Sequence, residues 1–277
     1  MLLTSLWESI QITFLVAVMM ITVDFINVRA EGKLALILHT TQKWKQYLLG
    51  SFLGTLPGCL GSYAGVSLYM HGIISFGALA GLMIATSGDE AFVMLAMFPK
   101  IAIILFIVLF IIGVFSGKII DSIVNKLNIQ NCMDCEAVQI HNDEKSYKHY
   151  IKDHIWNHIV KEHVWKIFLW TFGALLLIEF STNYLNLESL TSQYIWVVLL
   201  LSVLIGIIPD SGPHLIFVSL FAQGLIPFSI LLSSSIVQDG HGMLPMLSFS
   251  VKDSISIKIF NALIGLILGS ILLLLGL

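Results

Sequence analysis

Charged side chains are scarce in this chain. They make up 11% of its 277 residues, whereas a soluble domain carries about 25% charged residues. Hydrophobic residues make up 57%, and the mean hydropathy is +0.92. The composition therefore excludes an ordinary soluble domain and indicates an integral membrane protein.

Several sequence signatures are also missing. The three cysteines do not suggest a disulfide framework, and no basic patch of the nucleic-acid-binding type occurs. The chain has neither a Walker motif nor a serine nucleophile elbow, and "HIWNH" lacks the glutamate that follows the first histidine of a zinc protease. We therefore expect neither an enzyme nor an ATP-driven pump, which leaves secondary transport as the simplest mechanism.

Long apolar runs recur along the whole chain. Several reach the ~20 residues that a helix needs to cross a bilayer. A secretory signal alone cannot account for them, and the start "MLLTSLWESI" lacks the basic residues of one. The runs are 9–28, 47–71, 73–99, 101–120, 165–182, 192–208, 215–237, 243–251 and 255–276. They predict an all-α polytopic protein with about ten membrane segments.

The sequence contains an internal repeat. A shift of 152 residues aligns 53–98 with 205–250 without a gap, and 13 of the 46 positions are identical. The shared positions include Gly54/Gly206, Pro57/Pro209, Gly72/Gly224 and Gly88/Gly240. These residues break helices and are not ordinary lipid-facing positions, so we interpret the repeat as a duplication.

The loops after the first helix of each half predict opposite orientations. One loop carries Arg29, Lys33, Lys43 and Lys45, whereas its counterpart "NYLNLESLTSQ" has no lysine or arginine. By the positive-inside rule the first loop is cytoplasmic and the second external. We therefore expect two inverted-topology repeats, 1–120 and 163–277, with external termini and a cytoplasmic linker over 121–162.

Each half has two stretches where a helix is unable to continue smoothly. They are "LPGCLGS" (56–62) and "ATSGDEA" (85–91), which align with "IPDSGPH" (208–214) and "VQDGHGM" (237–243). Interrupted backbone inside a membrane must be buried in protein or line a wet cavity. We expect broken or re-entrant helices: either 46–71 is a hairpin and 73–99 a broken crossing, or the reverse.

Six ionisable side chains lie at or beside these breaks. A carboxylate near the bilayer centre costs at least ~2.5 kcal/mol, so such groups need a partner or a function. Oxygen ligands with one or two imidazoles suit Mn²⁺, with Zn²⁺, Fe²⁺ and Co²⁺ as alternatives; structural hydrogen bonding is the other interpretation. The predicted ligands are Asp89, Glu90, Asp210, His214, Asp239 and His241, supported by Thr86, Ser87, Ser62, Ser211 and Gln238.

Two further groups of residues lie outside the breaks. Asp24 and Glu179 lie near the end of the first helix of each half, where proton coupling and simple interfacial placement are equal alternatives. The linker carries metal-site residues, although a lone CxxC is a weak signal. They are Cys132, Cys135, His141, His154 and His158. The alternative for the linker is an amphipathic helix lying on the inner membrane surface.

Four stretches carry a resemblance to a known family. "TSGDEAFVMLAM", "PDSGPH", "QDGHGMLPMLSFSVKD" and "DHIWNHIVKEHVWKIFLWTF" resemble the bacterial ten-helix heavy-metal exporters, also named manganese transporters or arsenic efflux proteins. The resemblance covers nearly the whole chain. It implies a cytoplasmic-membrane exporter of a metal or metalloid, and the direction of transport rests on it alone.

The ligand chemistry ranks the substrates that these family names suggest. Trivalent arsenic prefers thiolates, yet the only cysteine in an apolar segment is Cys59, and its repeat counterpart is Ser211. We therefore expect export of Mn²⁺, with protons as counter-ion, the bilayer as surroundings, and no cofactor or nucleic acid. The rival hypotheses are an arsenite or oxyanion transporter and a non-transporting membrane subunit; the sequence leaves the oligomeric state open.

Overall fold

The fold of this chain is helical. The computed structural model describes residues 42–126 except 71, residue 191, residues 193–277, and individual residues within 6–18 and 164–176; the side chains of Leu60 and His241 are not described. Within these residues the regular secondary structure is helix, and no strand occurs. The predicted all-α class is confirmed for the described part of the chain.

The helices fall into two sets with matching positions. The first half consists of α3 (Lys43–Gly54), α4 (Leu60–Met70), α5 (Phe76–Ala85), α6 (Glu90–Met97) and α7 (Pro99–Lys126). The second half consists of α11 (Ile195–Gly206), α12 (Leu215–Ala222), α13 (Phe228–Val237), the short 3₁₀ helix η2 (Gly240–Gly242), α14 (Met243–Phe249) and α15 (Val251–Leu274). The helices α11, α13 and α15 start 152 residues after α3, α5 and α7, which is the offset of the sequence repeat.

The same turn ends the fourth helix and its counterpart. Gly72 and Gly224 both adopt positive φ, at 67° and 72°. The N–H of Ile73 donates to the Leu68 carbonyl at 2.9 Å, and the N–H of Leu225 donates to the Leu220 carbonyl at 2.9 Å. This six-residue closure is the Schellman motif, in which glycine supplies the left-handed residue. The local sequence thus stops both helices at equivalent points.

The predicted apolar runs are divided differently in the structure. The run 215–237 forms two helices, α12 and α13, because the turn at Gly224 is followed by Pro227, which precedes the first residue of α13. The predicted breaks do interrupt the helices, at 55–59, 86–89, 207–214 and 238–242. Residues Phe76–Met97, Pro99–Lys126 and Val251–Leu274 are long and apolar enough to cross a membrane among the described residues.

Each half packs around its own central helix. Helix α5 packs against α3 and α7, and α13 packs against α11 and α15. Glycines allow the close contact of α5 with α7: a Cβ built on Gly81 would overlap the Gly113 carbonyl, and one built on Gly77 would overlap the Gly117 carbonyl. This spacing of small residues is typical of tightly packed membrane helices.

The central helices and the outer helices differ in what surrounds them. The apolar window of Phe76–Met97 is 94% buried inside the protein, whereas those of α7 and α15 are 39% and 28% buried. The outer side of α7 exposes Ile103, Ile107 and Ile111 at a helical spacing of four. Such a stripe suits contact with lipid, while α5 and α6 are enclosed by the other helices.

Two buried carboxylates hold the helices together far from the breaks. Asp121 of α7 accepts hydrogen bonds from the Tyr47 hydroxyl at 2.7 Å and the N–H of Gly77 at 2.6 Å. Asp253, in the first turn of α15, accepts a bond of 2.9 Å from the hydroxyl of Tyr69 on α4. The second bond joins the two halves of the chain.

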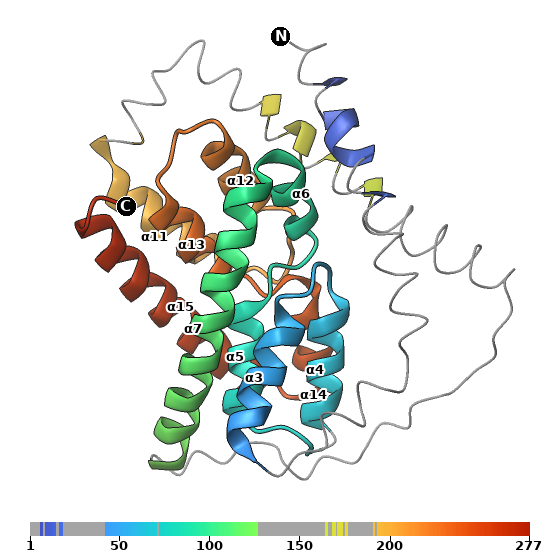
Figure 1. The fold of residues 1–277 in the computed structure, drawn as a ribbon, viewed down its shortest axis with the longest axis vertical. Coiled ribbons are helices and arrows are strands. Elements are labelled where there is room, and N and C mark those ends of the chain that lie inside the picture. The colour runs from blue at the N-terminus through green and yellow to red at the C-terminus, as the bar shows by residue number, and fades with distance from the viewer. Residues whose placement is uncertain are drawn as a thin grey trace, which may run out of the picture.

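The course of the chain is visible in Figure 1. The chain turns back between α3 and α4, whereas it passes through the break after α5 and continues into α6. Helix α7 begins beside α6 in the upper part of the view and ends at the bottom, while α15 runs upward from lower in the view to the left side, where C marks the end of the chain. Helix α7 continues to Lys126, six residues beyond the predicted boundary at 120, and the linker residues 127–163 lie outside the described part.

Candidate functional site

The four helix breaks meet at one place, which we call the junction. It is formed by residues 55–59, 86–89, 207–214 and 238–242. At its centre the glycines Gly88 and Gly240 lie against each other: a Cβ on Gly88 would lie 3.6 Å from the Cα of Gly240, and one on Gly240 would lie 3.5 Å from the Cα of Gly88. Both glycines have positive φ, at 52° and 55°. The equivalent breaks of the two halves therefore touch through backbone.

The other two breaks complete the junction. The N–H of Gly58 donates to the Gly88 carbonyl at 3.0 Å, and the Cys59 thiol donates to Asp89 Oδ1 at 3.5 Å. From the second half, the Ser211 hydroxyl lies 2.9 Å from a Cβ built on Gly88 and 3.1 Å from one built on Gly240. All four breaks are thus in contact with Gly88 or its neighbour Asp89.

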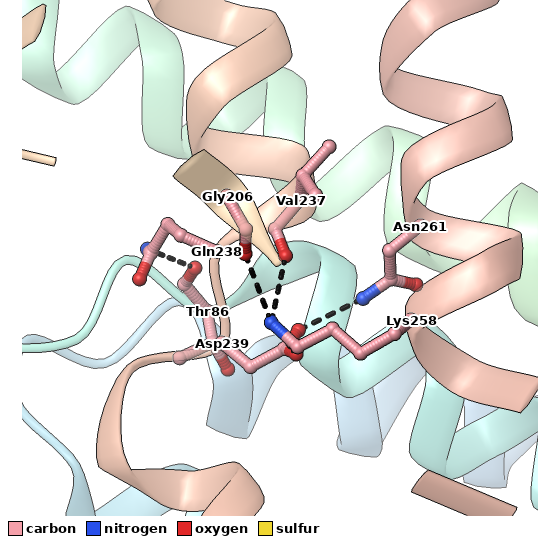
Figure 2. Close-up of polar contacts among 7 residues, drawn as sticks. All are labelled: Thr86, Gly206, Val237, Gln238, Asp239, Lys258 and Asn261. Atoms are coloured by element: carbon pink, nitrogen blue, oxygen red, sulfur yellow. Dashed lines mark hydrogen bonds and ion pairs between the residues drawn. The ribbon is translucent and has the colours of Figure 1, made fainter. Parts of the chain in front are cut away.

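A direct side-chain bond crosses between the two halves at the junction. The amide nitrogen Nε2 of Gln238 donates to the Thr86 carbonyl at 2.9 Å (Figure 2). The Thr86 residue follows the last residue of α5, and Gln238 follows the last residue of α13. The bond therefore satisfies a carbonyl that the end of α5 leaves without an intrahelical partner.

The predicted site residues lie on or beside this junction. Asp89 and Glu90 are buried at the start of α6, and Asp239, two residues after the end of α13, is fully buried. Asp210 is partly exposed and accepts a hydrogen bond of 3.1 Å from the N–H of Gly212. His214 is buried immediately before α12, with Nδ1 3.2 Å from the Ser234 hydroxyl oxygen.

Some polar side chains of the predicted ligands and supporting residues have local hydrogen bonds, and others do not. The Thr86 hydroxyl donates to the Leu82 carbonyl at 2.9 Å, and the Ser62 hydroxyl donates to the Cys59 carbonyl at 2.8 Å. Five other buried polar atoms of the predicted set have no hydrogen-bond partner among the described residues: Ser87 Oγ, Glu90 Oε2, Ser211 Oγ, His214 Nε2 and Gln238 Oε1. Because buried polar groups are normally satisfied, this cluster suggests that a ligand or water completes it.

Asp239 has a partner that sequence reasoning missed. Its Oδ2 lies 2.6 Å from Nζ of Lys258 on α15, and its Oδ1 accepts a 2.8 Å bond from the Asn261 side chain (Figure 2). A signal was present, because Lys258 falls within the apolar run 255–276, where a lysine is rare and marks a functional or paired position.

The described side chains do not close around a metal ion. Among them, no group of three or more histidine, cysteine, aspartate or glutamate residues is close enough to hold one. The His241 side chain belongs to the predicted set but is not described. The predicted residues Asp24, Glu179, Cys132, Cys135, His141, His154 and His158 all lie outside the described part. The six-residue metal set therefore stays a prediction.

Comparison with known proteins places the chain in a family. The family described as "Putative, 10TM heavy-metal exporter" matches residues 1–175 and, in a second segment, 152–275. The chain belongs to this family. Neither the curated proteins nor the solved structures contain a match to it. Membership in the heavy-metal exporter family, together with the apolar helices, identifies a multi-pass membrane transport protein.

The contact between the two central glycines leads to a prediction about transport by this exporter. Gly88→Ala adds a methyl group close to Ser211 Oγ and the Gly240 backbone, so we expect metal flux to fall to about a tenth of wild type or lower. Flux of purified protein in liposomes measures the effect. Gly72→Ala is the matched control, because Gly72 has a similar φ of 67° but no atom of the described residues within 4 Å of the place where a Cβ would lie. Equal flux in the two variants would show that the junction tolerates the added methyl group.

Proposed function

We propose that this exporter is a secondary transporter that carries a divalent metal cation, preferentially Mn²⁺, through the junction. The observation that carries the proposal is Glu90. Its carboxylate is buried, its Oε2 has no hydrogen-bond partner among the described residues, and it directly follows the buried Asp89. Two adjacent buried carboxylates repel each other in a low-dielectric site, and a divalent cation would neutralise both.

The other donor atoms at the junction suit a hard or borderline cation. Hydroxyl and amide oxygens are offered by Ser87, Ser211 and Gln238, and such oxygens suit Mn²⁺. His214 adds an imidazole whose Nδ1 contacts Ser234, while its Nε2 has no partner among the described residues. A hydrogen bond at one ring nitrogen is the usual way in which a protein orients the other toward a metal.

The thiol content of the junction disfavours a soft metalloid as cargo. Cys59 is the one cysteine among the described residues, and its thiol is hydrogen-bonded to Asp89. Trivalent arsenic and other soft ions prefer several thiolate ligands, whereas Cys59 offers a single thiol that is already hydrogen-bonded to a carboxylate. We therefore place Mn²⁺ ahead of arsenite.

We also propose how the halves are arranged in the membrane. They form an inverted repeat in which α3 and α4 are a re-entrant hairpin and α5 and α6 a broken crossing. The 152-residue offset of the helices and the opposite courses of α7 and α15 in Figure 1 support this arrangement. Inverted repeats with broken helices at their interface are the common architecture of secondary transporters, which move the halves around a central site.

The energy source that we propose is a proton gradient. The chain has no Walker motif, so direct use of ATP by this chain is not expected. The direction that we propose, export from the cytoplasm across the inner membrane, rests on membership in the exporter family. The positive charge of the loop 29–45 supports a cytoplasmic position for the linker 121–162.

Flux measurements with the purified exporter test this function. The protein is reconstituted into liposomes with an internal Mn²⁺-sensitive dye, with and without an imposed pH gradient, beside protein-free liposomes. We expect Mn²⁺ flux that requires the protein. The flux should increase when the imposed proton gradient runs in the direction opposite to the Mn²⁺ gradient, so that protons leave as Mn²⁺ enters. Flux of arsenite or an oxyanion without Mn²⁺ flux would contradict the proposed cargo, and gradient-independent Mn²⁺ flux would contradict proton coupling.

A further inference from the structure

The ammonium group of Lys258 is enclosed by oxygen atoms. Nζ lies 2.6 Å from Asp239 Oδ2, 3.0 Å from the Gly206 carbonyl and 3.2 Å from the Val237 carbonyl. An ammonium group has three donors, and these three oxygens match that number. Figure 2 shows the lysine reaching from α15 to this point.

The two carbonyls are the last ones of two helices. Gly206 ends α11 and Val237 ends α13. The carbonyls at a helix C-terminus lack intrahelical partners and carry partial negative charge. Two such helix ends and one carboxylate thus surround a single positive charge. The same kinds of oxygen atoms form alkali-cation sites in transporters with broken helices.

The equivalent place in the first half is built without this charge. With the 152-residue offset, Lys258 corresponds to Phe106, Asn261 to Leu109 and Asp239 to Ser87. Leu109 is fully buried, and Phe106 is partly buried and packs against the hydrophobic core. The two halves therefore differ in charge at the ends of equivalent helices, even though their helices correspond in position.

We propose that Lys258 is a tethered cation that occupies the cation position of the second half, so that Asp239 is not a ligand of the cargo. The cargo is then held by the side of the junction that carries Asp89 and Glu90, with one ion per chain. This inference rests on the proposed function as far as the cargo is concerned. The conclusion that Lys258 fills a cation position rests only on the contacts of Lys258.

Removal of the lysine side chain should open this position to a free cation. We expect Lys258→Ala to lower the thermal unfolding midpoint of the purified protein by about 10 °C in choline chloride, because Asp239 loses its partner. Na⁺ or K⁺ should restore at least half of that shift. Wild type and Lys252→Ala, which truncates an exposed lysine near the start of the same helix, should show no such response. A Lys258→Ala protein that unfolds at the same temperature in choline, Na⁺ and K⁺ would overturn the inference.

A double variant tests the same inference if Lys258→Ala does not fold. In Asp239→Asn/Lys258→Met the buried charges are removed together, and replacing a buried ion pair by uncharged groups is often neutral for stability. We expect this variant to unfold within a few degrees of wild type and to bind one Mn²⁺ per chain, measured by calorimetry. Loss of Mn²⁺ binding from the folded double variant would show that Asp239 is a cargo ligand. If wild type also fails to bind Mn²⁺, the proposed cargo is wrong, while the stability measurements still decide the role of Lys258.

Discussion

Replacement of Glu90 with glutamine is expected to abolish metal transport while the protein remains folded. Glutamine has nearly the same shape as glutamate, so the packing at the start of α6 should be kept, but the negative charge is lost. Removing one partner of a buried charge interaction costs about 3–5 kcal/mol, so the flux at low metal concentration should fall by about 100-fold or more. The initial rate of Mn²⁺ entry into dye-loaded liposomes, per folded protein, measures this effect.

The matched control for Glu90→Gln is Asp121→Asn. It makes the same carboxylate-to-amide change at another buried acid, which accepts hydrogen bonds from Tyr47 and Gly77 and lies outside the junction. We expect Asp121→Asn to lower stability but to keep the flux of each folded molecule near that of wild type. If Glu90→Gln transports Mn²⁺ at the wild-type rate, or if both variants lose flux equally, Glu90 does not bind the cargo.

The second large effect is expected on the fold. A Cβ on Gly81 would overlap the Gly113 carbonyl, so Gly81→Val has to push α5 away from α7. Because α5 also packs against α3, the helix has no free space into which it can move. We expect the free energy of unfolding to fall by about 3 kcal/mol. Most of the protein should be lost as aggregate during extraction in mild detergent, as measured by size-exclusion chromatography.

The control for this change is Gly173→Val, because no atom of the described residues lies within 4 Å of a Cβ built on Gly173. The control adds the same β-branched side chain to a glycine that no described residue crowds. We expect it to elute as folded protein. Recovery of Gly81→Val at the level of Gly173→Val would show that α5 and α7 do not need their close contact.

The sequence alone predicted several features that the structure bears out. Composition and the apolar runs identified a helical membrane protein, because a bilayer requires about 20 apolar residues for each crossing. The glycines and prolines located the four breaks, because both residues weaken a helix and because they cluster at aligned positions of the two repeats. The 152-residue offset of the repeat matches the offset of the helices. The resemblance in "TSGDEAFVMLAM" and "PDSGPH" named the family to which the chain belongs.

Other features required tertiary structure because they depend on contacts between distant residues. The pairing of Lys258 with Asp239 joins positions that are 19 apart, and the bond of Tyr69 to Asp253 joins positions that are 184 apart. The sequence also described 215–237 as one apolar run, whereas the turn before Pro227 divides it into two helices. A hydropathy pattern records how apolar a segment is, but it does not record which segments face each other.

The charges at the junction show this division most clearly. The sequence by itself determined that carboxylates lie at interrupted helices, because residue identity and helix-breaking tendency are local properties. Only the tertiary structure decided that Asp239 lies against an ammonium group and the ends of α11 and α13, while Glu90 keeps a carboxylate oxygen without a partner among the described residues. The reason is physical: the cost of a buried charge depends on the groups that surround it in space.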